Sequence, residues 1–151
     1  MSSVTAIISA YYAAEFLPIR LQNLFAQKPK PEIIVVCQTG SAEDKIASQY
    51  DTIIIHTPDV PTIGTAWNLG LSIASGDYIT TANSDDLFTV DGLKTMVKAL
   101  DENPEAALVF SAVNLQHGDT ISPWYRLHTE TGFVPDIVDT LVHRCVIGSM
   151  P

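Results

Sequence analysis

Four consecutive polar residues follow a predicted buried strand near the middle of the sequence. The run 77–82 leads directly into Asn83, Ser84, Asp85 and Asp86, and a helical pattern follows. Two adjacent carboxylates there need solvent, a donor or a cation, because an unpaired charge in low dielectric is costly. A divalent metal that binds few protein oxygens and completes its coordination with phosphates suits such a pair. These residues therefore indicate a nucleoside-diphosphate site.

The side-chain pattern assigns different roles within this group. Strand alternation places Asn83 and Asp85 on one side, so that Asp85 could bind the metal while Asn83 or Ser84 offers a polar group to a ribose. Asp86 would then be a supporting acid or a helix-start residue. The alternative is that both acids only favour the N-terminus of the following helix, which is the common case for an arbitrary Asp-Asp pair. Their place after a central strand favours the metal site.

Short apolar runs rich in β-branched residues alternate with segments of helical spacing. We expect strands at 4–9, 32–37, 52–56, 77–82 and 106–113, and helices near 17–25, 42–50, 63–74 and 93–100. This order predicts a three-layer α/β/α domain with a mostly parallel central sheet. Beyond residue 114 we expect a turn at 116–119 between two short antiparallel strands, and residues 121–151 have no clear period.

Composition limits the classes of function. A chain of 151 residues, with 46% hydrophobic and 17% charged residues, fits one globular domain. The net charge of −9 argues against a nucleic-acid groove, which depends on Lys and Arg. An acidic protein can still bind one diphosphate if a metal supplies positive charge. The sequence has no glycine-rich phosphate loop of the P-loop or dinucleotide-binding type.

The cysteines and histidines give no metal motif by spacing. Cys37 and Cys145 form no CxxC pattern, so we expect a reduced, cytoplasmic setting, with peripheral attachment to the inner face of a membrane left open. We expect Cys37 to act as a small buried hydrophobe. No signal peptide is recognisable, and no window is apolar enough for a membrane span.

Four segments, in order, resemble the inverting GT-A-fold glycosyltransferases of family 2. Residues 7–17 resemble that family's I-P-x-Y-N-x-E-x-x-L, and residues 32–41 resemble E-I-I-V-V-D-D-G-S. Residues 66–70 resemble A-R-N-x-G, and residues 75–86 resemble the run into the D-x-D metal motif. Together the resemblance covers about residues 4–113, which is more specific than any single segment.

The resemblance implies a GT-A-like (Rossmann-like) domain that holds a nucleotide-sugar donor, with a UDP-sugar as the leading choice, across the strand ends. A Mn²⁺ or Mg²⁺ ion would be bound at Asp85, with Asp86 beside it. The implied nucleotide-binding residues are Ser9, Tyr11, Glu15, Gln38, Ser41, Gly64, Asn68, Asn83 and Ser84. The full enzyme would transfer a sugar to a glycan, lipid-linked or protein acceptor and invert the anomeric centre.

The sequence departs from the family pattern at several positions. Residues 37–39 replace the usual acidic pair, although the Gln38 amide can pair with a pyrimidine edge as donor and acceptor. Tyr12 stands in the usual Asn position and Ser9 in the usual Pro position. Asn83 replaces the first Asp of D-x-D.

The catalytic base is not identified by the sequence. In this family it is an acid of the acceptor-binding half, and we expect that portion to be incomplete after about residue 114. Asp136 and Asp139 are interpreted as solvated loop acids. Three alternatives remain: a non-catalytic or truncated nucleotide-sugar-binding module, a nucleotidyltransferase, and an α/β partner-binding domain. Residues 9–15 lack the Gly and Lys of the nucleotidyltransferase loop, and a homo-oligomer stays open.

Overall fold

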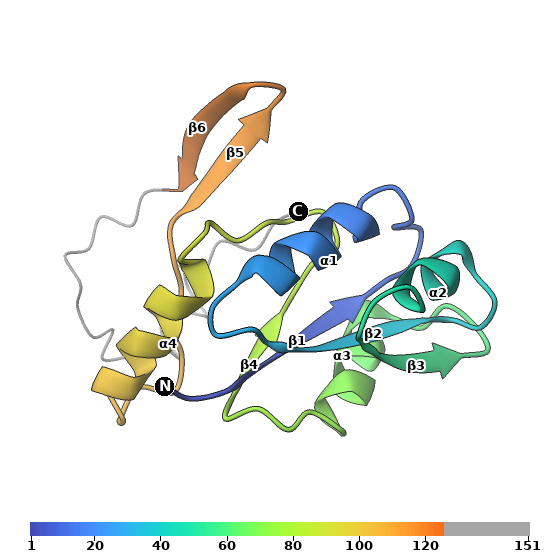
Figure 1. Ribbon diagram of the computed structural model, residues 1–151, viewed down its shortest axis with the longest axis horizontal. Coiled ribbons are helices and arrows are strands. Elements are labelled where there is room, and N and C mark those ends of the chain that lie inside the picture. The colour runs from blue at the N-terminus through green and yellow to red at the C-terminus, as the bar shows by residue number, and fades with distance from the viewer. Residues whose placement is uncertain (126–151) are drawn as a thin grey trace. The chain divides into compact units, whose positions relative to one another are not determined.

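The computed structural model describes residues 1–125, which divide into a unit ending at Asp101 and a second unit beginning at Glu102. The first unit alternates strands and helices in the predicted order (Figure 1). Its elements are β1 (Val4–Ser9), α1 (Leu17–Ala26), β2 (Glu32–Gln38), α2 (Ala42–Ala47), β3 (Ile53–Thr57), α3 (Ile63–Leu71), β4 (Tyr78–Thr81) and α4 (Gly92–Glu102). The first four predicted strands and all four helices are confirmed, with ends displaced by a few residues.

Four strands form one parallel sheet in the order β3-β2-β1-β4. In the register of this sheet, Ser9 pairs with Val36 and Gln38 pairs with Thr57, while Ile7 pairs with Thr81. All four strands therefore end at the same edge, which we call the carboxyl edge. This edge is where open parallel sheets present ligand sites.

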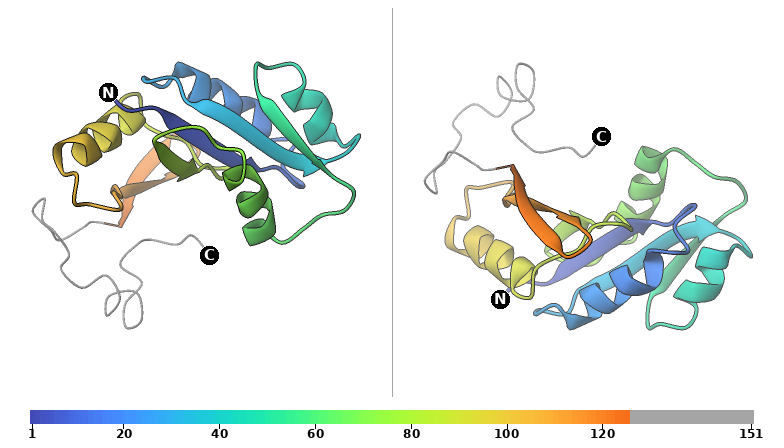
Figure 2. Two further views of the ribbon diagram at one scale, coloured as in Figure 1. Left: turned by 90° about the horizontal axis from the view of Figure 1, so that it is seen from below. Right: turned by 90° about the horizontal axis from the view of Figure 1, so that it is seen from above.

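Helices cover both faces of the sheet and give the three layers (Figure 2). On one face, α1 and α2 bury Leu21, Leu24 and Ala47 against alternate residues of β1 and β2. On the other face, α3 packs Ala66 against Ile7 and Ile34. Gly70 of α3 lies so close to Ile7 that a Cβ atom would collide with that side chain. The predicted α/β/α architecture is confirmed.

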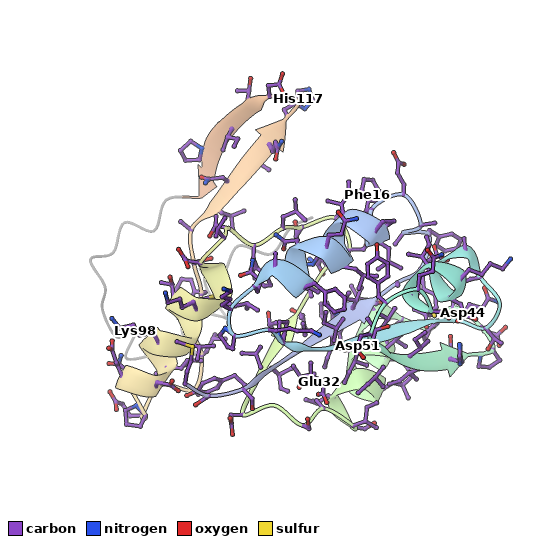
Figure 3. All side chains as sticks on the ribbon, viewed as in Figure 1. Phe16, Glu32, Asp44, Asp51, Lys98 and His117 are labelled. Carbon is purple, nitrogen blue, oxygen red and sulfur yellow. The ribbon has the colours of Figure 1, made fainter. Side chains whose placement is uncertain are left out.

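Glu32 connects three segments at the opposite, amino edge of the sheet. Its Oε2 accepts a hydrogen bond from Thr5 Oγ1 (2.6 Å), and its Oε1 accepts one from Ser75 Oγ (2.8 Å). The hydrogen bond from Thr5 is the main reason why the pKa of Glu32 lies below its ordinary value. Figure 3 shows Glu32 well separated from Asp44, which belongs to α2.

The second unit begins differently from the prediction. The expected strand over 106–113 is wrong: among the described residues, 106–112 contain no strand, and β5 (Val113–His117) pairs antiparallel with β6 (Thr120–Tyr125). An apolar segment tends to be buried, but it forms a strand only if a neighbouring strand bonds to its backbone. Amino-acid composition does not specify that neighbour. The predicted turn between antiparallel strands is confirmed, with Gly118 at a φ of 60°.

Candidate functional site

The acidic pair lies in the segment after β4, which we call the acid loop (residues 83–91). Ala82 is still bound to the sheet, because its N–H donates to the carbonyl of Ile7 (2.8 Å). Beyond it, Asn83 Nδ2 donates to Asp86 Oδ2 (2.9 Å), whereas Asp85 is exposed. The loop therefore places one accessible carboxylate at the carboxyl edge and supports it with a neighbouring amide–carboxylate pair.

Two amide side chains, one within α1 and one at its C-cap, fix the backbone of the acid loop. Asn23 Nδ2 donates to the carbonyl of Phe88 (2.8 Å), and Asn23 Oδ1 accepts from the N–H of Phe88 (2.9 Å). One turn later, Gln27 Nε2 donates to the carbonyl of Thr89 (3.1 Å), and its Oε1 accepts from the N–H of Leu93 (3.2 Å). The position of the loop is thus set by α1 rather than by the acidic side chains.

Arg20 lies one turn before Asn23 on α1 and carries a buried positive charge. Its side chain is 1% exposed, its guanidinium lies 4.6 Å from the centroid of the Phe88 ring, and Nη1 donates to Asn23 Oδ1 (3.1 Å). Burial lowers the pKa of Arg20 to about 10, and the attraction of Asp86 and then of Asp85 opposes that shift. A positive charge therefore supports both acids from the protein interior.

At the other end of the carboxyl edge, β1, β2 and β3 form what we call the β2–β3 corner (residues 37–44 and 56–59). The Thr57 hydroxyl donates to the carbonyl of Asp59 (2.7 Å), so the Tyr11 hydroxyl donates to Thr57 Oγ1 (2.8 Å). Burial raises the pKa of Tyr11, with the Thr57 bond acting in the opposite direction. Gln38 Nε2 donates to the carbonyl of Pro58 (3.1 Å). Tyr11 and Gln38 thus bind neighbouring residues at the end of β3.

Helix α2 connects this corner to the loop after β1. Ser41 is its N-cap, as predicted, and accepts from the N–H of Asp44 (3.2 Å). Glu43 is buried and accepts from the N–H of Ala13 (2.8 Å). Burial alone would raise the pKa of Glu43, but hydrogen bonds from backbone amides, among them its own and that of Ala13, lower it overall.

Tyr12 has the unusual backbone of this loop. Its φ is 54°, in the left-handed region, and its side chain is 89% exposed. A bulky residue rarely adopts this conformation, whereas Asn does so more readily. An Asn, which the resemblance described above leads one to expect at this position, would adopt this backbone at a lower conformational cost than Tyr12.

The remaining predicted residues lie at or after the end of β1, on α3 and in the acid loop. Ser9 and Ser84 are half-buried, and Glu15 is exposed. Gly64 and Asn68 are exposed one turn apart on α3, and a Cβ atom at Gly64 would meet open space. Among the hydrogen bonds of residues 1–125, none links Glu15 or Asn68 to the acid loop or to the β2–β3 corner. Their nucleotide-binding roles stay predictions.

The acid loop has the donor chemistry that a hard divalent cation requires. Asp85 supplies an accessible carboxylate, and Asp86 and Asn83 supply further oxygens within three residues. Mg²⁺ and similar ions are bound through one or two carboxylates together with substrate phosphates. The residues present therefore fit such an ion, and Asp85 is the side chain that would hold it.

Several structurally important residues were not predicted. Arg20, Asn23 and Gln27 recur at i, i+3 and i+7 on one face of α1, and this polar stripe is a signal that sequence inspection could have found. Glu43 and Asp44 follow a Ser N-cap, which is the pattern of a capping box. Asp136 and Asp139 lie outside the described residues.

Comparison with known families gives an independent result. The model of the family described as "Glycosyl transferase family 2" matches residues 5–146. An uncharacterised glycosyltransferase of Rickettsia bellii is 24% identical over 152 residues, covering 97% of this chain and 22% of the relative. Glycosyltransferase GlyG of Streptococcus pneumoniae is 20% identical over 123 residues, covering 77% of this chain and 41% of the relative. The chain thus spans less than half the length of either relative.

Solved structures agree on the fold. A crystal structure of S. aureus TarS (residues 1–349) has a TM-score of 0.61 and 21% identity, covering 68% of this chain and 33% of that one. The mannosyltransferase PcManGT of Pyrobaculum calidifontis, in complex with GDP-Man and Mn²⁺, has a TM-score of 0.58 and 23% identity, covering 66% and 32%. The fold of residues 1–101 is of the GT-A type. Separately, no helix in residues 1–125 has the length and apolar character needed to cross a bilayer.

Proposed function

The chain belongs to glycosyl transferase family 2, and from this premise we propose that it binds the nucleotide-sugar donor of a metal-dependent, inverting glycosyltransferase. The observation that carries the proposal is the exposed carboxylate of Asp85 at the carboxyl edge, on a loop whose backbone is fixed by α1. A UDP-sugar is the proposed donor. A glycan, a lipid-linked sugar or a protein is the proposed acceptor.

In this proposal Asp85 would hold a divalent ion, Mn²⁺ or Mg²⁺, beside the donor. Such an ion would supply Lewis-acid chemistry, offsetting the charge that develops on a departing nucleoside diphosphate. Asn83 orients Asp86 through their hydrogen bond, and Arg20 partly neutralises the two acids from the interior. The Mn²⁺ complex of PcManGT, a protein of the same fold, supports a metal of this kind.

Nucleoside recognition is proposed at the β2–β3 corner. The Gln38 amide can donate to and accept from the edge of a pyrimidine base. It now donates to the carbonyl of Pro58, an exposed hydrogen bond that could be exchanged for one to water or to a base. Tyr11 is held by Thr57 beside it. Ser9, Glu15 and Ser41 are proposed to surround the base and ribose, with Gly64 and Asn68 on α3 and Asn83 and Ser84 on the acid loop.

A thermal-shift panel tests this proposal. The purified chain is melted with UDP, GDP, ADP or CDP, in Mn²⁺ or in EDTA. A nucleotide present at about 100 times its Kd stabilises by about 2.7 kcal/mol, which for a domain of this size raises Tm by roughly 5–10 °C. We expect that rise for UDP in Mn²⁺ and little change in EDTA.

The matched variants are Asp85→Ala and Asp91→Ala. Both positions are exposed acids of the acid loop, so the two substitutions change the net charge equally. We expect Asp85→Ala to abolish the Mn²⁺-dependent shift and Asp91→Ala to retain it. Equal shifts in both variants, or no shift with any nucleotide, contradict the proposal. A donor-hydrolysis assay on the same protein separates binding with turnover from binding alone.

A further inference from the structure

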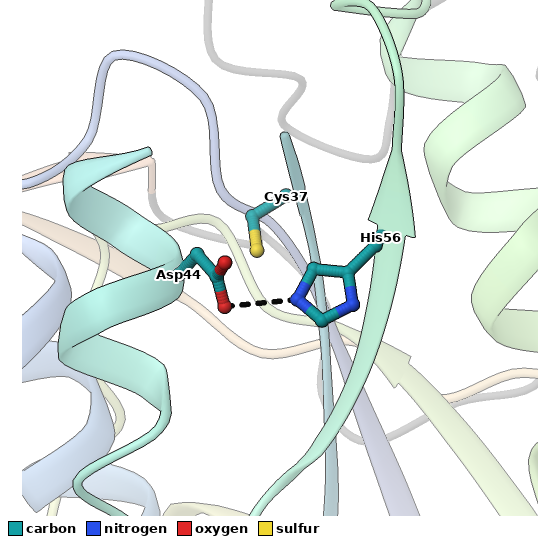
Figure 4. A group of neighbouring side chains, drawn as sticks. All are labelled: Cys37, Asp44 and His56. Atoms are coloured by element: carbon teal, nitrogen blue, oxygen red, sulfur yellow. Dashed lines mark hydrogen bonds and ion pairs between the residues drawn. The ribbon is translucent and has the colours of Figure 1, made fainter. Parts of the chain in front are cut away.

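Three side chains of different chemistry meet at the β2–β3 corner, away from the acid loop. Cys37 of β2 and His56 of β3 are paired in the parallel register, and Asp44 of α2 lies over them. His56 Nε2 and Asp44 Oδ1 are 2.9 Å apart, and the Cys37 sulfur lies beside them (Figure 4). One thiol, one imidazole nitrogen and one carboxylate oxygen all lie within 4.8 Å of one another.

We propose that Cys37, Asp44 and His56 form a second metal site, which binds a borderline-soft ion of the Zn²⁺ type. Zn²⁺ takes thiolate, imidazole and carboxylate ligands at about 2.0–2.3 Å, so neighbouring ligand atoms of a tetrahedral site are about 3.5 Å apart. Because the three atoms lie within 4.8 Å of one another, shifts of about 1 Å bring them to this spacing.

The carboxylate is already held in place for this role. Asp44 Oδ2 accepts a hydrogen bond from the N–H of Gly40 (2.8 Å), which leaves Oδ1 directed at His56. Hydrogen bonds of this kind orient metal ligands and are part of most metal sites. Cys37 comes from the buried sheet, whereas the His56 side chain is 46% exposed, so an ion can enter from solvent. A fourth coordination position stays open there to water or another donor.

The chemistry separates this site from the one proposed at Asp85. The acid loop offers oxygen atoms only, which suit Mg²⁺ and Mn²⁺, while a thiolate with an imidazole selects Zn²⁺ and related ions. Binding forms one sulfur–metal, one nitrogen–metal and one oxygen–metal bond. It also opens the His56–Asp44 hydrogen bond, moves the proton of His56 from Nε2 to Nδ1 through solvent, and releases the Cys37 thiol proton to solvent, without any transfer of electrons. The site does not depend on the proposed donor function.

Cobalt substitution tests the proposal on the intact chain. Co²⁺ added to EDTA-treated, reduced protein should give the near-ultraviolet absorption of a sulfur-to-cobalt charge transfer, together with the intense visible bands of a tetrahedral ion. Zn²⁺ should displace the cobalt and raise Tm in the absence of nucleotide. A protein without the sulfur-to-cobalt absorption overturns the proposal.

Variants identify the ligands. His56→Gln and Asp44→Asn act at positions that are not fully buried, and each should weaken Co²⁺ binding at least about 100-fold. Cys37→Ala should remove the charge-transfer absorption while far-ultraviolet circular dichroism shows a folded protein. The controls Cys145→Ser and His117→Gln should leave the spectrum unchanged. Loss of the absorption in Cys145→Ser, or unchanged affinity in His56→Gln, contradicts the site.

Discussion

The acid loop and the β2–β3 corner occupy the same edge of one sheet but are held by different contacts. In the acid loop, neutral amides of α1 bind backbone groups, through Asn23 to Phe88 and through Gln27 to Thr89 and Leu93. In the corner, some side chains bind backbone groups, as Gln38 does at the carbonyl of Pro58, but others bind one another, as in the pairs of Tyr11 with Thr57 and of Asp44 with His56.

This difference determines how far each region depends on the residue types of its own side chains. Contacts to the backbone fix where the acid loop lies, so the position of this loop does not depend on which side chains stand at residues 83 and 85. Contacts between side chains depend on the residue types themselves. Residues 37–39, where the sequence departs from the pattern that it resembles, lie in the corner.

The largest expected effect concerns Arg20, the buried residue of α1 that packs on Phe88 of the acid loop. Arg20→Ala should destabilise the chain by about 3 kcal/mol, because it empties the space against Phe88 and leaves Asn23 without one partner. Arg20→Met keeps the packing and removes the charge, and it should recover at least half of that loss. Urea denaturation measures both. Equal losses would mean that the charge matters more than the packing.

Asn23→Ala comes next. It leaves both the N–H and the carbonyl of Phe88 without their partner, and we expect a loss of about 2 kcal/mol together with weaker Mn²⁺-dependent nucleotide binding. The control is Gln22→Ala on the exposed face of the same helix, which should change stability by less than about 0.5 kcal/mol. If both variants lose the same amount, α1 does not hold the loop in the way described.

Tyr12 tests the loop after β1, between the acid loop and the corner. Tyr12→Asn should stabilise the chain by up to about 1 kcal/mol, because Asn adopts the left-handed backbone at lower cost. Val60→Asn is the matched control, since Val60 is also an exposed loop residue but is not among the described residues with a positive φ. Thermal melts of both variants decide the point, and stabilisation by both would show that strain at Tyr12 is not the cause.

The smallest expected effect concerns how the stability of the chain depends on pH. Glu32 should contribute to this dependence, whereas the hydrogen bonds of Asn23 to the acid loop should not. The pKa of Glu32 is lowered in the folded chain, so its contribution is complete above its ordinary value of 4.5 and is lost as the pH falls through the lower folded value. Glu32→Gln should flatten the acid limb of the stability curve. Asn23→Ala should leave that limb unchanged in shape, because Asn23 and Phe88 do not titrate. A changed slope in Asn23→Ala contradicts this division.

Much of this organisation is predictable from sequence. Period-two and period-3.6 apolar patterns place four strands and four helices, and the acidic pair after β4 follows from strand ends and turn chemistry. The prediction of a strand over 106–113 was wrong, because an apolar composition does not show which strand would pair with that segment. The roles of Arg20, Asn23 and Glu43 depend on contacts between segments far apart in the chain, as does the meeting of Cys37, Asp44 and His56. Local patterns do not contain such contacts.

The central claim is that Asp85 binds the divalent ion that holds the donor diphosphate. Electron paramagnetic resonance of free Mn²⁺, titrated with the chain in the presence of UDP, measures this binding directly. We predict that Asp85→Asn weakens Mn²⁺ binding at least about tenfold, as removal of a charged ligand should, and that Asp91→Asn leaves it unchanged. Wild-type affinity in Asp85→Asn, or the same loss in Asp91→Asn, would contradict the account.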